Sequence, residues 1–104
     1  MLYHSTRGGG QAVDSARAVL EGLAPDGGLY MPEALPAFDW KKCLEGSSMD
    51  MSTMILSALL PDIPNMPELV KRAYTGKFET DHLTPTVGVG DFGVLELFRG
   101  PTSA

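Results

Sequence analysis

The stretch VGVGDFGVLELF, residues 87–98, decides the class of fold. Its two ends, 87–89 and 94–98, are apolar and rich in residues that favour strands, and Gly90-Asp91-Phe92-Gly93 between them supplies turn chemistry. This pattern predicts a β-hairpin. The preceding part of the chain has helical spacing, with no regular alternation of strands and helices. The sequence therefore predicts an α+β (irregular α/β) fold, with a small mixed sheet and about three helices.

The same stretch contains G-x-G-x-x-G, formed by Gly88, Gly90 and Gly93. In a dinucleotide-binding fold the third glycine opens a helix, whereas here strand-like residues follow it. A kinase glycine-rich loop lies between two strands, but it needs a lysine on the next strand and a separate catalytic loop, and this sequence supplies neither. We therefore interpret the three glycines as parts of the hairpin and its turn.

Three helices are expected in the first three quarters of the chain. Apolar spacing predicts the first from about Ala12 to Glu21, with Gly22 as its C-terminal cap. The second is expected at about 49–60, capped by Ser47 or Ser48. The third is expected to start with Asn65 as its N-cap and to end before Gly76. Residues 33–48 give no clear pattern.

Two short strands are expected near the N-terminus, Leu2 to His4 and Leu29 to Met31, the second stopped by Pro32. Pro25-Asp26-Gly27-Gly28, just before the second strand, has the residues of a tight turn. The chain of 104 residues is 43% hydrophobic, which suits a single domain with a modest core.

Composition argues against several kinds of partner. The net charge is −5 and no basic cluster exceeds two residues, so nucleic-acid binding is disfavoured. No apolar run reaches the length that spans a bilayer, and the N-terminus lacks the apolar region of a signal peptide, which predicts a cytoplasmic protein. Cys43 stands alone, and His4 and His82 are isolated, so no disulfide and no metal site are predicted.

The segment Ser5-Thr6-Arg7-Gly8-Gly9 is a candidate binding loop. Two hydroxyls and a guanidinium beside glycines are groups that suit a phosphate or another anion. The competing interpretation, which we favour from the residues alone, is a structural loop in which Arg7 pairs with a carboxylate.

Three stretches taken together resemble the N-terminal domain of threonine synthase. They are YHSTRGG at 3–9, GLAPDGGLYMPE at 22–33 and VLELFRGPTSA at 94–104, and they occur in the order found in that family. The resemblance covers essentially the whole chain. It implies that residues 1–104 form the N-terminal domain of a fold-type II pyridoxal phosphate enzyme, packed in the intact enzyme on larger catalytic domains.

The resemblance also implies an activity. Threonine synthase converts O-phosphohomoserine and water to threonine and phosphate with pyridoxal phosphate as cofactor. In the family, a lysine that binds the cofactor follows the G-P-T-x-A motif within a few residues, and this sequence stops at Ala104. We therefore expect a fragment that contains no catalytic residue and that, by itself, is inactive and binds no pyridoxal phosphate.

Some positions carry over from the family as site residues. Gly100, Pro101, Thr102 and Ser103 match the loop that leads to the lysine, and the resemblance implies that they lie next to the cofactor. Ser5, Thr6 and Arg7 match the early motif, and with Arg99 they are implied to lie near the substrate. Arg99 departs from the family, which usually has histidine there.

Two alternatives stay open. The chain could be the N-terminal domain of a threonine synthase-like phospho-lyase, since the substrate pocket that would separate the two activities lies further along the chain. It could also be a free-standing interaction module without enzymatic activity. Such a module would dock through an apolar face, for which Met51, Met54, Leu59 and Leu60 are candidates.

Overall fold

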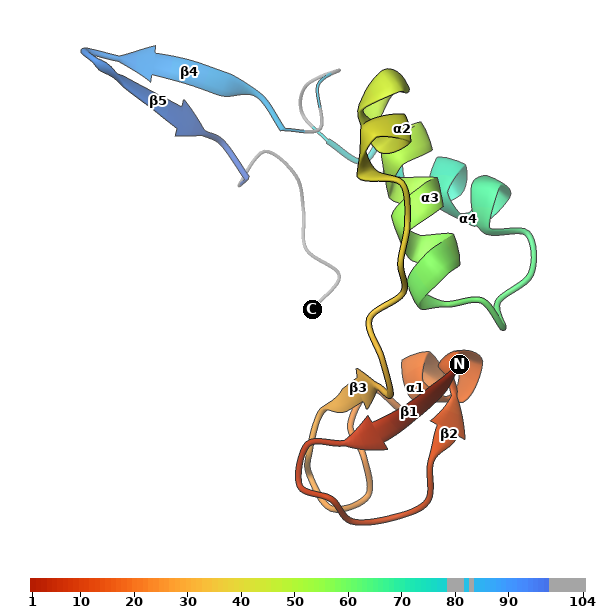
Figure 1. Cartoon of the computed structure of the whole chain (residues 1–104). Helices are drawn as coiled ribbons and strands as arrows, with labels where there is room; N and C mark the ends of the chain where they lie inside the picture. The colour runs from red at the N-terminus through yellow and green to blue at the C-terminus, as the bar shows by residue number, and fades with distance from the viewer. Residues whose placement is uncertain (79–81, 83, 98–104) are drawn as a thin grey trace. The chain divides into compact units, whose positions relative to one another are not determined.

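The computed structural model describes residues 1–78, 82 and 84–97. The chain divides into two compact units, Met1–Pro67 and Glu68–Ala104, which are described separately. The elements, labelled in Figure 1, are β1 (Leu2–Ser5), β2 (Val13–Asp14), α1 (Ser15–Glu21), β3 (Tyr30–Pro32), α2 (Trp40–Glu45), α3 (Ser48–Leu59), α4 (Met66–Tyr74), β4 (Thr86–Val89) and β5 (Phe92–Leu95). The predicted α+β class is confirmed.

The first unit is built on a three-stranded antiparallel sheet in the order β2-β1-β3. Tyr3 pairs with Val13 on one side and with Pro32 on the other. The side chain of Tyr3 points into the core and is buried, whereas Leu2 and His4 on either side are exposed, as the two-residue period of a strand requires. Pro32, expected to stop β3, is instead its last residue, which is tolerated because β3 is an edge strand.

Helix α1 starts three residues later than the sequence predicted. Val13 and Asp14 form β2 instead, because they pair with β1, a long-range contact that helical spacing does not reveal. The Asp14 side chain then caps the helix by accepting a hydrogen bond from the Arg17 backbone N–H at 2.7 Å. Gly22 ends the helix at φ 72°, as expected for a C-terminal glycine, and its N–H donates to the Ala18 carbonyl.

The buried face of α1 also differs from the apolar stripe that helical spacing predicts, which consists of Ala12, Ala16, Val19, Leu20 and Leu23. Leu20 is 87% exposed, while Ala18 is buried against Tyr3 and Val13. Met1, Tyr30 and Leu60 are partly buried residues that pack on this cluster.

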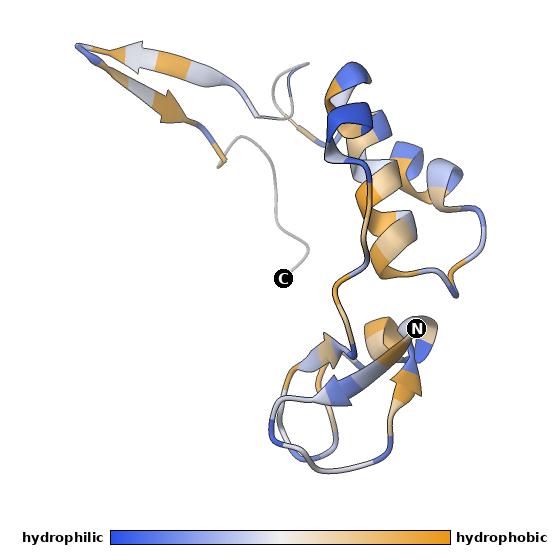
Figure 2. Ribbon diagram, in the orientation of Figure 1, coloured by the Kyte–Doolittle hydropathy of each residue, from blue (hydrophilic) through white to orange (hydrophobic). Residues whose placement is uncertain are grey.

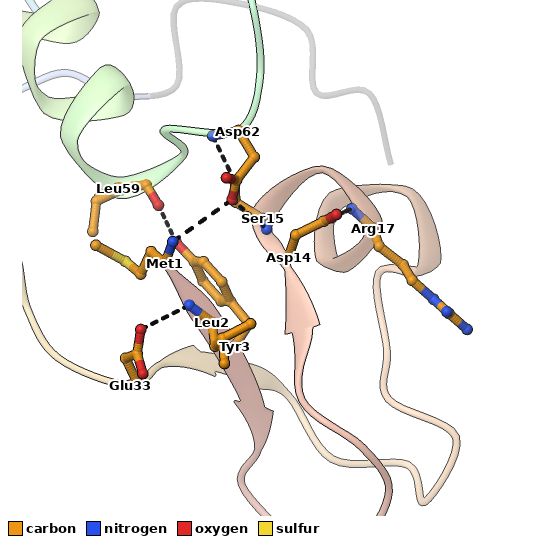
Figure 3. Close-up of polar contacts among 9 residues, drawn as sticks. All are labelled: Met1, Leu2, Tyr3, Asp14, Ser15, Arg17, Glu33, Leu59 and Asp62. Atoms are coloured by element: carbon orange, nitrogen blue, oxygen red, sulfur yellow. Dashed lines mark hydrogen bonds and ion pairs between the residues drawn. The ribbon is translucent and has the colours of Figure 1, made fainter.

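Polar contacts tie the end of α3 and the turn after it to the sheet and α1 (Figure 3). The Tyr3 hydroxyl donates to the Leu59 carbonyl. Ser15, which is fully buried, donates to the Asp62 carboxylate from its hydroxyl at 2.8 Å and from its backbone N–H at 3.1 Å. The Asp62 N–H donates back to the Ser15 hydroxyl at 3.2 Å. The Met1 ammonium lies 3.9 Å from the same carboxylate. The buried Ser15 hydroxyl therefore both donates and accepts a hydrogen bond.

Helices α2 and α3 follow the sheet within the first unit. α2 lies in the stretch that gave no sequence pattern, and Asp39 caps it by accepting from the N–H groups of Lys41 and Lys42. α3 begins within one residue of the predicted start, with Ser47 and Asp50 forming a capping box. Cys43 in α2 is buried, and its thiol lies 3.9 Å from the Met54 sulfur in α3.

Helix α4 begins one residue after Asn65. The prediction that Asn65 is its N-cap is wrong. The Asn65 φ of 58° lies in the left-handed region, whereas an N-cap residue has an extended backbone.

In the second unit the predicted hairpin is confirmed, as β4 and β5 pair antiparallel from Thr86–Leu95 to Val89–Phe92. The turn contains only Gly90 and Asp91, with Gly90 at φ 60°, so it is shorter than the four-residue loop expected from sequence.

Candidate functional site

The candidate binding loop, residues 5–9, lies beside the turn formed by residues 25–28. β1 and β3 bring the two segments together, since Ser5 at the end of β1 pairs with Tyr30 at the start of β3. The Thr6 N–H donates to the Leu29 carbonyl at 2.8 Å, and the Leu29 N–H donates to the Thr6 hydroxyl at 3.0 Å. Thr6 and Leu29 are 23 residues apart in sequence, yet the two segments form one hydrogen-bonded structure.

The carboxylate of Asp26 is the centre of this structure. One of its oxygens accepts from the Ser5 hydroxyl at 2.6 Å and from the Gly28 N–H at 2.9 Å. The other accepts from the Gly9 N–H at 2.9 Å. The hydrogen bond from Ser5, followed by the bonds from the two backbone N–H groups, lowers the pKa of Asp26 below its ordinary value. The carboxylate is thus ionised at neutral pH and joins the two segments.

Glycine is required at two positions because of this arrangement. A Cβ atom on Gly28 would lie 2.1 Å from the Ser5 hydroxyl oxygen, and one on Gly9 would lie 2.6 Å from the Asp26 carboxylate. Both distances are shorter than any van der Waals contact. The glycines in the two motifs are therefore explained by close packing around Asp26.

Arg7 lies at the exposed edge of the same structure. Its Nη1 atom donates to the backbone carbonyl of Asp26 at 2.9 Å, and its backbone N–H donates to the Ser5 hydroxyl at 3.1 Å. Within the part of the chain that the structure describes, the guanidinium makes no other hydrogen bond or ion pair. A guanidinium has five N–H donors, so Arg7 retains donors that face solvent.

These contacts show what the loop can bind. The N–H groups of Gly9 and Gly28, which would hold a phosphate, already donate to Asp26, and the carboxylate itself would repel an anion. The described residues of the loop therefore do not fit the phosphate of pyridoxal phosphate. The exposed guanidinium of Arg7 remains able to contact a carboxylate or phosphate presented from outside.

The other predicted site residues, Arg99, Gly100, Pro101, Thr102 and Ser103, lie outside the described residues. Within the described ranges 1–78, 82 and 84–97, no group of three or more His, Cys, Asp or Glu side chains is arranged to hold a metal ion. No helix among the described residues is both long and apolar enough to cross a membrane.

The first unit also has an apolar pocket that sequence reasoning missed. Its volume is about 350 Å³, and it is lined by side chains from β1, α1, β3 and the end of α3: Tyr3, Ala18, Val19, Gly22, Leu29, Tyr30, Met31 and Leu60. No local pattern could have identified it, because its walls come from four separate segments.

A small polar cluster includes one residue of this pocket. The Tyr30 hydroxyl donates to the carboxylate of Glu21, which also accepts from Arg17 Nε at 2.7 Å. The hydrogen bond from Tyr30, with that from Arg17, lowers the pKa of Glu21, and the same contact raises the pKa of Tyr30. These interactions fix the Tyr30 ring beside the apolar pocket.

Comparison with known proteins places this geometry in a family. The sequence profile described as threonine synthase N terminus matches residues 2–74. Threonine synthase of Methylobacillus glycogenes is 36% identical over 118 aligned residues, which cover 100% of this chain and 25% of the relative. Threonine synthase-like 2 of Mus musculus is 33% identical and covers 100% of this chain and 23% of the relative.

Solved structures agree. The crystal structure of pyridoxal phosphate-bound threonine synthase from Brucella melitensis superposes with a TM-score of 0.81 at 33% identity, over 97% of this chain and 23% of that one. The fold thus has the architecture of the N-terminal part of a pyridoxal phosphate-dependent threonine synthase. The chain belongs to the threonine synthase family, and it spans about a quarter of the length of the curated relatives.

Proposed function

We propose that the chain serves as the N-terminal part of a threonine synthase that converts O-phosphohomoserine and water to threonine and phosphate. The observation that carries this proposal is the similarity to threonine synthases in both sequence and fold over essentially all of the chain. The cofactor would be pyridoxal phosphate, which supplies an electron sink for carbanion chemistry when bound. We assign its binding to the catalytic part of the enzyme, since the described loop does not fit its phosphate.

The role of residues 1–104 in this proposal is to complete and support the active site. Residues 1–104 would act as one N-terminal domain packed against the catalytic domains of a cytoplasmic enzyme. Arg7 would face the substrate through its solvent-facing donors, together with Ser5, Thr6 and Arg99. Gly100, Pro101, Thr102 and Ser103 would lie beside the cofactor, where glycine permits close backbone approach and hydroxyls can donate to a phosphate.

A chimeric enzyme tests the proposal. Residues 1–104 would replace the corresponding N-terminal quarter of the Methylobacillus glycogenes enzyme, and release of phosphate and threonine from O-phosphohomoserine would be measured. We expect a chimera that binds pyridoxal phosphate and forms threonine. A folded chimera without activity, beside an active parent enzyme, would contradict the proposal and favour a free-standing interaction module.

The role of Arg7 can be tested in the same chimera. Arg7→Ala is expected to raise KM for O-phosphohomoserine several-fold, and Arg7→Lys is expected to restore part of the affinity, because a positive charge remains. Arg72→Ala, at an exposed position of α4, is the matched control and should leave KM unchanged. Equal KM values for Arg7→Ala and Arg72→Ala would remove Arg7 from the substrate site.

A second candidate function is supported by the similarity to the mouse threonine synthase-like 2 protein over the whole chain. A phospho-lyase acting on a related amino-acid substrate would consume water and release phosphate, ammonia and a keto acid in place of threonine. Product analysis of a full-length enzyme that contains residues 1–104 would separate the two activities. Threonine as the product supports synthase activity, and a keto acid formed in equal amount to phosphate supports the phospho-lyase.

A further inference from the structure

The β4–β5 hairpin has one face made entirely of exposed apolar side chains. Cross-strand partners Val87–Val94 and Val89–Phe92 lie on the same face, because directly opposed residues in an antiparallel pair share a face and alternate residues along a strand return to it. The four side chains are 43%, 40%, 59% and 77% exposed, in the order Val87, Val94, Val89 and Phe92. We call these four residues the hairpin apolar face; apolar bands on both strands are visible in Figure 2.

The opposite face of the hairpin is different. It carries Thr86, Leu95 and the directly paired glycines Gly88 and Gly93. The glycine pair leaves the middle of this face without side chains. The hairpin therefore has one apolar face and one face with few side chains. This pattern is typical of a strand pair that packs against another layer by one face.

A two-stranded hairpin of this length has little stability of its own in water. Independent stability needs at least a third strand or packing of an apolar face against another element. In the described residues, all eight positions of β4 and β5 are exposed. Its apolar face therefore requires a partner.

Two boundaries, one after residue 67 and one after residue 74, fall between the N-terminal sheet and the hairpin. The family profile ends at residue 74, at the end of α4, although similarity to threonine synthases continues over the whole chain. The division into compact units likewise puts the hairpin apart from residues 1–67. The matched threonine synthases have about three quarters of their length outside the region that this chain covers.

We infer that the hairpin apolar face docks on the catalytic part of a threonine synthase and is the surface through which residues 1–104 pack on that part. This inference rests on the proposed function. The occupant is an apolar protein surface of the same enzyme. It explains why the similarity to the family continues through the hairpin after the N-terminal profile has ended.

The test uses the chimera described above and the 104-residue chain. Val89→Thr combined with Val94→Thr keeps the shape and the β-branched character of both side chains but makes the hairpin apolar face more polar. Leu95→Thr is the control, because Leu95 is apolar and 53% exposed but lies on the opposite face. Melting temperatures, amide hydrogen exchange of the hairpin and sedimentation would be measured.

We expect Val89→Thr with Val94→Thr to lower the melting temperature of the chimera by several degrees, and Leu95→Thr to leave it nearly unchanged. Neither change should affect the melting temperature of the 104-residue chain. Hairpin amides should be protected from exchange in the chimera and unprotected in the 104-residue chain.

Four outcomes would overturn the inference. If the chimera is active and the double substitution leaves its melting temperature unchanged, docking of the hairpin apolar face is excluded while the proposed function stands. A dimer of the 104-residue chain that the double substitution dissociates would identify a second copy as the occupant. Loss of stability in the 104-residue chain would show that the chain covers the face itself. An inactive unsubstituted chimera would overturn the proposed function, and this inference with it.

Discussion

Among single residues, Ser15 has the clearest structural role. Its side chain is fully buried, donates to the Asp62 carboxylate and accepts from the Asp62 N–H. Ser15→Ala would remove both bonds, so that the Asp62 carboxylate and the Asp62 N–H each lose a partner. We expect a loss of about 1–3 kcal/mol in the free energy of unfolding, measured by urea denaturation.

The control for this measurement is Ser57→Ala, at an exposed position of α3. It makes the same chemical change where water can satisfy the backbone, so its effect should be within about 0.5 kcal/mol of zero. An equal loss for the two variants would show that the Ser15–Asp62 contacts contribute nothing specific.

The candidate site shows how far sequence reasoning reaches at the residue scale. Ser5, Thr6 and Arg7 were recognised as a polar loop, and Asp26 was recognised as a turn residue, because both signals are local. That Asp26 accepts from Ser5 and Gly9 was not predictable, since these contacts span 21 and 17 residues and depend on the pairing of β1 with β3. The favoured interpretation was a structural loop in which Arg7 pairs with a carboxylate. The Arg7 charge does interact with the Asp26 carboxylate, but the guanidinium donates its hydrogen bond to the Asp26 backbone carbonyl.

At the scale of elements, α3 shows what a local signal can determine. Ser47 accepts from the Asp50 N–H, and the Asp50 side chain accepts from the Ser47 N–H, so that two donors at the start of the helix are satisfied. Ser47→Ala is expected to reduce the free energy of unfolding by about 1 kcal/mol. Both variants would be compared by thermal denaturation. Ser48→Ala, one residue into the helix, should have a much smaller effect than Ser47→Ala. A reversed order would place the cap at Ser48.

The elements that were predicted well have short-range signals, and the others do not. The turn residues Gly90 and Asp91 and the cap Ser47 lie beside the elements that they define. The start of α1 was wrong because Val13 pairs with Tyr3 in the sheet, and helical periodicity cannot report such a contact. The exposure of Leu20 has a related cause, since Ala18 is the α1 residue that packs with Tyr3 and Val13 of the sheet.

For the whole molecule, acid should destabilise the fold. The pKa values of Asp26, Asp50 and Asp62 lie below the ordinary value, chiefly through hydrogen bonds from Ser5, the Ser47 N–H and Ser15 respectively. A lowered pKa in the folded state means that the unfolded state binds protons first as the pH falls. The stabilisation is therefore complete above about pH 4 and is lost as the pH falls through the lower folded-state values.

Urea midpoints measured between about pH 6 and about pH 3 test this expectation. The midpoint should fall steadily below about pH 4, and Asp62→Asn should show a shallower fall because one of the carboxylates with a lowered pKa no longer titrates. A midpoint that stays constant down to about pH 3 would mean that these hydrogen bonds do not distinguish the ionised from the protonated carboxyl groups.

The division of the molecule into two units predicts that residues 1–74 fold without the hairpin. The core of Tyr3, Val13 and Ala18 and the contacts between Ser15 and Asp62 lie within residues 1–67, and the family profile ends at residue 74. A chain of residues 1–74 keeps α4 whole, including Val70, which is 2% exposed. Because β4 and β5 are exposed throughout, their removal takes no side chain out of a buried core. We expect thermal unfolding of residues 1–74 to stay cooperative, with a midpoint close to that of residues 1–104. A gradual, non-cooperative transition would show instead that the second unit is needed to hold the first one together.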